Sequence, residues 1–165
     1  MRERDRDKGR LKDIIEYSDN VTNFISGHTF ETFVADKLTY YSVMKNVEVV
    51  GEAAYMLSKA FKKAHPETPW KIVQGMRHVL VHDYAGIDSK ELFNTAVNGI
   101  PELREQVEKY LVETDWEAWT SAPDDFEDFA DENTLKLAQR MKADGMAVEL
   151  ISKYTGLTEK EIENL

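Results

Sequence analysis

Apolar residues recur along this chain at intervals of three and four, which is the period of an amphipathic α-helix. The first run joins Leu11, Ile14, Ile15, Val21, Phe24 and Ile25, and Gly27 follows it as a helix stop. Glycine and proline are scarce, with 8 and 4 among 165 residues, and no segment shows the apolar–polar alternation of a β-strand. We therefore predict an all-α fold, an antiparallel helical bundle.

Three further helical segments are expected after Gly27. The pattern across about residues 29–64 indicates one long helix or two stacked helices. Another helix begins at Trp70, where Thr68 can cap it and Pro69 suits the first turn. A fourth covers roughly residues 88–112, and Pro101 is expected to break or kink it.

The charge of the chain is concentrated in one segment. The formal net charge is −10, and residues 113–132 carry nine carboxylates and no basic side chain. The remaining 145 residues are close to neutral, which leaves room for a small cationic site for a phosphate. We predict a helical bundle over residues 1–112, an acidic linker over 113–132 and a helix-turn-helix-like trihelical unit over 133–165.

Composition excludes several classes of protein. The absence of cysteine removes disulfides, thiolate metal ligands and cysteine nucleophiles. No run approaches the ~18 apolar residues of a membrane-spanning helix. The N-terminal residues, MRERDRDKGR, lack the apolar core of a secretory signal. We expect a cytoplasmic protein with no membrane partner.

The residues best suited to catalysis or ligand binding lie together in GMRHVLVHDYAGID, residues 75–88. This stretch holds Arg77, His78, His82, Asp83 and Tyr84 within an otherwise apolar helix end. On a helix, His78 and His82 lie roughly 40° apart, while Arg77 and Tyr84 nearly superimpose. The two pairs flank one edge of the helix, which can line a cleft or meet its own copy across a dimer.

Three interpretations of this edge remain open from the residues alone. Arg77, His82 and Tyr84 can simply hydrogen-bond helix ends in a bundle core. His78 and His82, at i and i+4, can chelate zinc, although no third ligand is evident. In the third interpretation the site cleaves a phosphodiester: a histidine moves protons near neutral pH and an arginine grips the phosphate. With RNA as substrate, the 2′-hydroxyl can serve as the nucleophile, and no metal or cofactor is needed.

The sequence also resembles a known family. Arg77-X4-His82-X-Tyr84 is similar to the RX4HXY motif of the HepT-like HEPN ribonucleases, the toxins of HEPN/MNT toxin–antitoxin pairs. The segments VVGEAA (49–54), HPETPWKIVQGMRHVLVHDYAGID (65–88) and PELREQVEKYL (101–111) follow the order and spacing of that family. The resemblance covers about residues 8–112.

The resemblance implies a homodimeric bundle in which two copies of the motif face one groove. Arg77 and His82 would be the catalytic pair of a metal-independent endoribonuclease, leaving a 2′,3′-cyclic phosphate. His78 stands where the family most often has asparagine, and would be a helper. Tyr84 matches the tyrosine to which a partner nucleotidyltransferase adds AMP. Glu52 matches an acidic residue on the neighbouring helix and would support Arg77 or a helix end.

Two other functions are alternatives to an RNA-cleaving toxin. One is a non-catalytic HEPN module that binds a protein or nucleotide partner. The other is a DNA-binding regulator acting through residues 133–165, although that unit carries five basic and five acidic side chains and no basic cluster. For the ribonuclease, the overall acidity favours a short or structured substrate such as transfer RNA. The acidic segment is expected to be a solvated linker, and a brake on RNA binding is its alternative. Its aromatic residues indicate a linker that packs and is not a free tail: Trp116, Trp119, Phe126 and Phe129.

Overall fold

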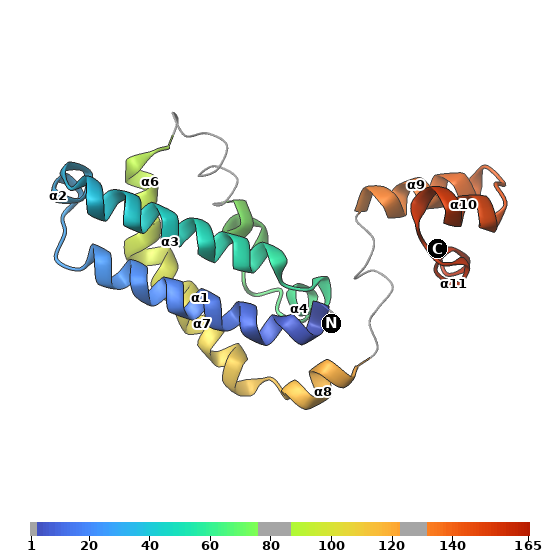
Figure 1. Ribbon diagram of the computed structural model, residues 1–165, viewed down its shortest axis with the longest axis horizontal. Coiled ribbons are helices and arrows are strands. Elements are labelled where there is room, and N and C mark those ends of the chain that lie inside the picture. Colours follow the sequence, from blue (N-terminus) through green and yellow to red (C-terminus); the bar gives the residue numbers. More distant parts are fainter. Residues whose placement is uncertain (1–2, 76–86, 123–131) are drawn as a thin grey trace. The chain divides into compact units, whose positions relative to one another are not determined.

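The computed structural model describes residues 3–75, 87–122 and 132–165. It divides the chain into two compact units, Met1–Ala122 and Pro123–Leu165. The described residues form helices and connecting loops, with no strand among them (Figure 1). The predicted all-α class is confirmed.

The first unit contains α1, α2, α3, α4, α6, a π-helical turn η1, α7 and α8 among its described residues. Residues 70–75 are helical as well. The bounds are α1 Glu3–Ile25, α2 Phe30–Ala35, α3 Lys37–Met56, α4 Lys59–Ala64, α6 Ser89–Asn94, η1 Thr95–Gly99, α7 Ile100–Glu113 and α8 Trp116–Ser121.

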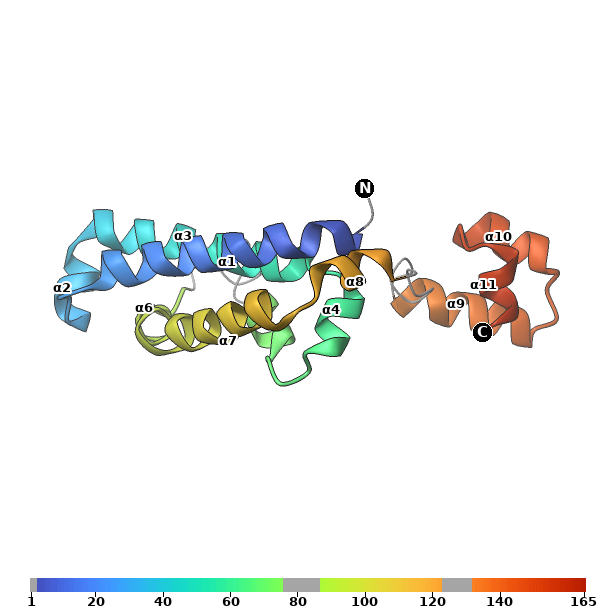
Figure 2. The same ribbon diagram turned by 90° about the horizontal axis from the view of Figure 1, so that it is seen from below.

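Helix α1 lies against both α3 and α7 and forms the centre of the first unit (Figures 1 and 2). Near one end of α1, Asp7 binds Ser58, just beyond α3, and near the other end Asn20 binds Asn46. These contacts make α1 and α3 antiparallel. The apolar faces of the helices meet in one core, whose largest fully buried side chains are Phe33, Phe61, Leu11, Ile14, Ile100, Val21, Val43, Val47, Val50 and Val107.

The predicted helix or helix pair over 29–64 is three helices in the structure. Asp36 ends α2 and also caps α3, because its carboxylate accepts from the amides of Leu38 and Thr39. Ser58 caps α4 by accepting from the amide of Phe61 at 3.0 Å. Gly27, the predicted stop, has a φ of +77°, a left-handed conformation that glycine adopts without strain.

The predicted disturbance at Pro101 takes the form of a π-helical turn. Residues 89–113 stay helical throughout, and η1 ends at Gly99, two residues before Pro101, which is the second residue of α7. Proline has no N–H to donate, and its ring crowds the carbonyl four residues earlier. The regular pattern of backbone hydrogen bonds in the α-helix must therefore change locally. The wider π turn accommodates both effects and keeps the helix continuous.

Helix α8 belongs to the first unit, although the sequence placed its residues in the acidic linker. Trp119 donates from Nε1 to Asp7 Oδ2 at 3.2 Å, and its ring lies 5.5 Å from that of Phe61. Trp116 donates to the carbonyl of Leu111 at 3.0 Å. Two tryptophans thus hold residues 116–121 on the bundle.

The second unit contains α9 (Glu132–Ala143), α10 (Val148–Thr155) and α11 (Glu159–Glu163). Its own core consists of Ala138, Ile151, Leu157 and Ile162. Gly156 ends α10 with a φ of 74°, and the Lys142 ammonium bonds the carbonyls of Ile162 and Glu163. These contacts close a small trihelical unit.

None of the helices within the described ranges is both long and apolar enough to span a bilayer.

Candidate active site

The predicted catalytic and modification residues lie outside the described residues. Arg77, His78, His82 and Tyr84 all fall within 76–86. The structure therefore leaves their predicted roles untested, and it describes the two ends of the segment and Glu52.

The incoming end of the segment is anchored in an aromatic cluster. The Trp70 ring is 6% exposed, and its Nε1 donates to the carbonyl of His65 at 2.8 Å. Phe61 packs against both Trp70 and His65, with ring centroids 6.2 and 4.5 Å away. Val73 is buried in the same core. The helix that leads into the motif therefore starts from a rigid base.

The sequence predicted that Thr68 caps the helix beginning at Trp70, but in the structure its side chain bonds residues of α7. Its hydroxyl donates to Gln106 Oε1 at 2.8 Å and lies 2.6 Å from the Tyr110 hydroxyl. It thus ties the loop before Trp70 to α7. Burial raises the pKa of Tyr110 to about 12.

The outgoing end of the segment is equally well fixed. Asp88 caps α6 by accepting from the amides of Lys90 and Glu91. Ser89 lies 3.1 Å from the hydroxyl of Tyr40 on α3, and Ile87 packs against the core. Both local capping and a contact with α3 thus fix the chain where it leaves the motif.

Both described ends are tied to the same helix, α3. Gln74 Nε2 donates to the carbonyl of Ala54 at 3.5 Å, and Ser89 contacts Tyr40. These two points are about 21 Å apart along α3, at 1.5 Å per residue. Glu52 lies between them and is half-buried. Its predicted partnership with Arg77 stays a prediction.

Sequence reasoning missed Asp7 as a structural centre for this end of the bundle. The carboxylate is fully buried and accepts from Ser58 and Trp119. Burial raises the pKa of Asp7, with these hydrogen bonds and Arg10 acting in the opposite direction. The available signal was its spacing, because Asp7 lies four and seven residues before Leu11 and Ile14, on the apolar face.

Groups of three or more His, Cys, Asp or Glu side chains that could hold a metal do not occur in residues 3–75, 87–122 or 132–165. The pair formed by His78 and His82 lies outside those ranges.

The described residues of the first unit define an all-helical bundle, in which both ends of the segment that holds the predicted site are tied to α3. More narrowly, the chain belongs to the family described as Ribonuclease HepT-like, whose family model matches residues 14–110. The match includes Glu52 and the whole of the Arg77-X4-His82-X-Tyr84 motif. It ends before α8 and the second unit.

Individual relatives agree with this assignment. "Putative RNase MJ1216" of Methanocaldococcus jannaschii is 36% identical over 104 residues, covering 63% of this chain and 86% of the relative. "Probable ribonuclease HepT" of Thermococcus cleftensis is 37% identical over 102 residues, covering 62% of this chain and 93% of the relative. No solved structure matches the chain.

Proposed function

We propose that this protein is a metal-independent endoribonuclease and the toxin of a HEPN/MNT-type toxin–antitoxin pair. One observation carries the proposal: the chain belongs to the Ribonuclease HepT-like family, and the matched residues contain Arg77-X4-His82-X-Tyr84. The names of the relatives point to the same activity, since both describe ribonucleases.

In the proposed reaction, the substrate supplies its own nucleophile. The ribose 2′-oxygen attacks the adjacent phosphorus, the bond from phosphorus to the 5′-oxygen breaks, and a 2′,3′-cyclic phosphate remains. One imidazole takes the proton of the 2′-hydroxyl, and an acid returns a proton to the leaving 5′-oxygen. His82 is the proposed proton carrier, with His78 as a helper.

Arg77 is the proposed phosphate ligand. A guanidinium can bind two phosphate oxygens at once and offset the charge that develops on them in the transition state. Glu52, half-buried on α3, is the proposed support for Arg77. These assignments need no resident metal or cofactor.

The active form is proposed to be a homodimer in which two motifs share one groove. Arg77 of one copy can then act with His82 of the other. Transfer RNA is the proposed substrate class, because a chain with a net charge of −10 attracts long RNA weakly.

Tyr84 is the proposed site of control by a partner nucleotidyltransferase. Addition of AMP would bring a negatively charged phosphate and considerable bulk to the groove. Like-charge repulsion would then oppose RNA binding.

The direct test is cleavage of total transfer RNA in EDTA by the purified wild type and by Arg77→Ala and His82→Ala. We expect cleavage by the wild type and a loss of at least a hundredfold in each variant. His28→Ala is the matched control, because His28 lies in the turn between α1 and α2 and should retain full activity.

Three results would separate the alternatives. An inert wild type whose mass shows no modification would favour a non-catalytic binding module. An inert wild type that carries added AMP would point to a silenced toxin. Activity restored by mixing the Arg77→Ala and His82→Ala variants would establish that the catalytic pair forms across two chains.

A further inference from the structure

A shallow groove of about 530 Å³ lies beside the segment that leads into the motif. Its walls come from α4, the following loop and the helical residues 70–75. It is lined mainly by Lys62, Lys63, Lys71, Pro66, Pro69 and Trp70. Among the lining residues that the structure describes, three are lysines and none is a carboxylate. We call this feature the lysine groove.

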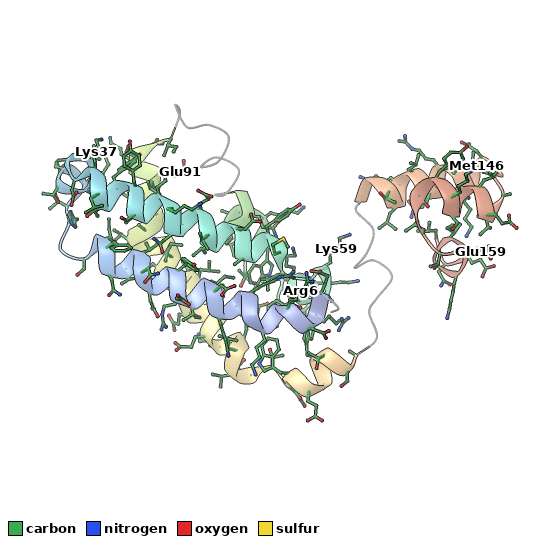
Figure 3. All side chains as sticks on the ribbon, in the orientation of Figure 1. Arg6, Lys37, Lys59, Glu91, Met146 and Glu159 are labelled. Atoms are coloured by element: carbon green, nitrogen blue, oxygen red, sulfur yellow. The ribbon has the colours of Figure 1, made fainter. Side chains whose placement is uncertain are left out.

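The lysine groove has the opposite charge to the protein as a whole. Residues 59–74 carry four lysines and one glutamate, whereas the complete chain has a net charge of −10. The fourth lysine, Lys59, stands at the start of α4 (Figure 3). On an acidic protein, a polyanion is attracted to a local positive region and repelled elsewhere. The lysine groove therefore directs a polyanionic ligand to this part of the surface.

Lys62 is the half-buried lysine of the lysine groove. Its ammonium donates to the carbonyl of Tyr55 at 3.0 Å, which is a neutral acceptor. Burial lowers the pKa of Lys62; Asp7 opposes this shift, and the nearby cations Arg10 and Lys59 reinforce it. An anion in the groove would offset this crowding of like charges.

The backbone under the lysine groove is firmly held. Asp7 binds Ser58, which caps α4, and Trp70 is fixed by its bond to the carbonyl of His65. Lys63 and Lys71 are exposed on this frame. Ile72, 66% exposed, and the two prolines add apolar surface to the lining of the same groove.

We propose that the lysine groove binds the sugar–phosphate backbone of RNA next to the cleaved phosphodiester. The inference rests on the proposed ribonuclease function and adds a substrate-binding surface to it. Lysine ammonium groups contact phosphates as point charges, and the proline and isoleucine surfaces can pack against ribose or base faces. Lys71 precedes Arg77 by only six residues, so the groove leads along the chain to the motif.

The binding test uses a fluorescent single-stranded 2′-O-methyl RNA, which lacks the nucleophilic hydroxyl and so remains intact. Affinity is measured by anisotropy over a range of salt concentrations for the full chain and for Lys62→Gln/Lys63→Gln/Lys71→Gln. We expect Kd to rise about tenfold or more at low salt. The slope of log K against log salt should fall by about 2, at about 0.7 per lost phosphate contact.

The matched control is Lys12→Gln/Lys109→Gln/Lys153→Gln. It removes the same charge from exposed positions outside the lysine groove, and its salt slope should equal that of the wild type. Because Lys62 also bonds Tyr55, the exposed Lys71→Gln is measured as well, with an expected fall in slope of about 0.7. Equal affinities for the groove and control variants, or a wild type that binds acidic protein but no RNA, would overturn the proposal.

A cleavage assay separates this inference from the proposed function. On a dinucleoside monophosphate, which has only the cleaved phosphodiester and no flanking phosphate for the lysine groove to bind, the groove variants should match the wild type, while their kcat/KM on transfer RNA falls about tenfold. Lysine-dependent RNA binding by an inert wild type whose mass shows no modification would support RNA binding by the lysine groove and refute the ribonuclease function. RNA cleavage that stays unchanged when all three lysines are replaced would refute RNA binding by the lysine groove but not the proposed ribonuclease function.

Discussion

Asp7 on α1 and Ser58, just ahead of α4, are joined by two hydrogen bonds across 51 residues of chain. Asp7 Oδ1 accepts from the Ser58 amide at 2.8 Å, and Oδ2 accepts from the Ser58 hydroxyl at 2.6 Å. The same hydroxyl accepts from the Phe61 amide and so caps α4. One buried carboxylate thus fixes the helix that carries Lys62 and Lys63.

Removal of the Asp7 carboxylate should destabilise the folded protein. In Asp7→Ala the Ser58 amide and the Trp119 indole N–H lose a buried acceptor, and we expect the free energy of unfolding to fall by about 3 kcal/mol. Asp7→Asn retains one acceptor oxygen and should lose about half as much. Urea unfolding measures both, with the exposed Asp13→Asn on the same helix as control.

Asp7 also predicts a pH dependence. Burial raises the pKa of Asp7 in the folded state above its ordinary value of 3.8, so the folded state holds the proton more tightly than the unfolded state. Stability from this group is therefore lost as the pH rises through the folded pKa. The stability advantage of the wild type over Asp7→Asn should grow between pH 7 and pH 4, and a constant difference would contradict the assignment.

Phe61 should be the most sensitive position of the aromatic cluster. It is fully buried, and its ring lies within 6.3 Å, centroid to centroid, of Trp70, Tyr110 and Trp116. Phe61→Ala should cost about 3–5 kcal/mol, through lost transfer energy and the cavity that remains. Near-ultraviolet circular dichroism should weaken with it. Phe24→Ala, at a side chain 42% exposed, should change stability far less.

Tyr110 predicts a loss of stability in alkali. Its pKa is raised to about 12 in the folded state from 10.0, so the unfolded chain loses the phenolic proton first. Stability is therefore lost as the pH rises between 10 and 12, by roughly 1 kcal/mol at pH 11. Tyr110→Phe should be less stable than the wild type at pH 8, where it lacks the bond to Thr68, and should regain that difference at pH 11. Tyr41→Phe, at an exposed ring, should show no such crossover.

Because Met1–Ala122 and Pro123–Leu165 form separate compact units, we expect that the chain can be truncated after Ala122 without loss of the first unit's stability. A chain that ends at Ala122 retains α8, and its unfolding midpoint should stay within about 2 °C of that of the intact bundle. A chain that ends at Val112 loses Trp116 and Trp119 and should be clearly less stable. If residues 123–165 only extend the chain, the first truncation should cleave transfer RNA at the rate of the full chain. Faster cleavage would instead identify an acidic brake.

The sequence by itself determined the helical class, because the spacing of apolar residues directly reports which face of a segment is buried. Local signals also placed several boundaries, including the stop at Gly27 and the disturbance before Pro101. The family resemblance, which the comparisons confirm, rested on residue order alone. The roles of Arg77, His82 and Tyr84 remain predictions from that resemblance.

Only the tertiary structure decided which groups meet across the bundle. Local pattern indicated that Thr68 can cap a helix, but its hydroxyl bonds Gln106 and Tyr110 on α7. The composition of 113–132 suggested a linker, but Trp119 binds Asp7 and holds α8 on the first unit. The periodicity of apolar residues identifies which face of a helix is buried, but not which helix packs against that face. Contacts over tens of residues depend on the complete packing of the chain, which also gathers the lysines of α4 and residues 70–75 into one groove.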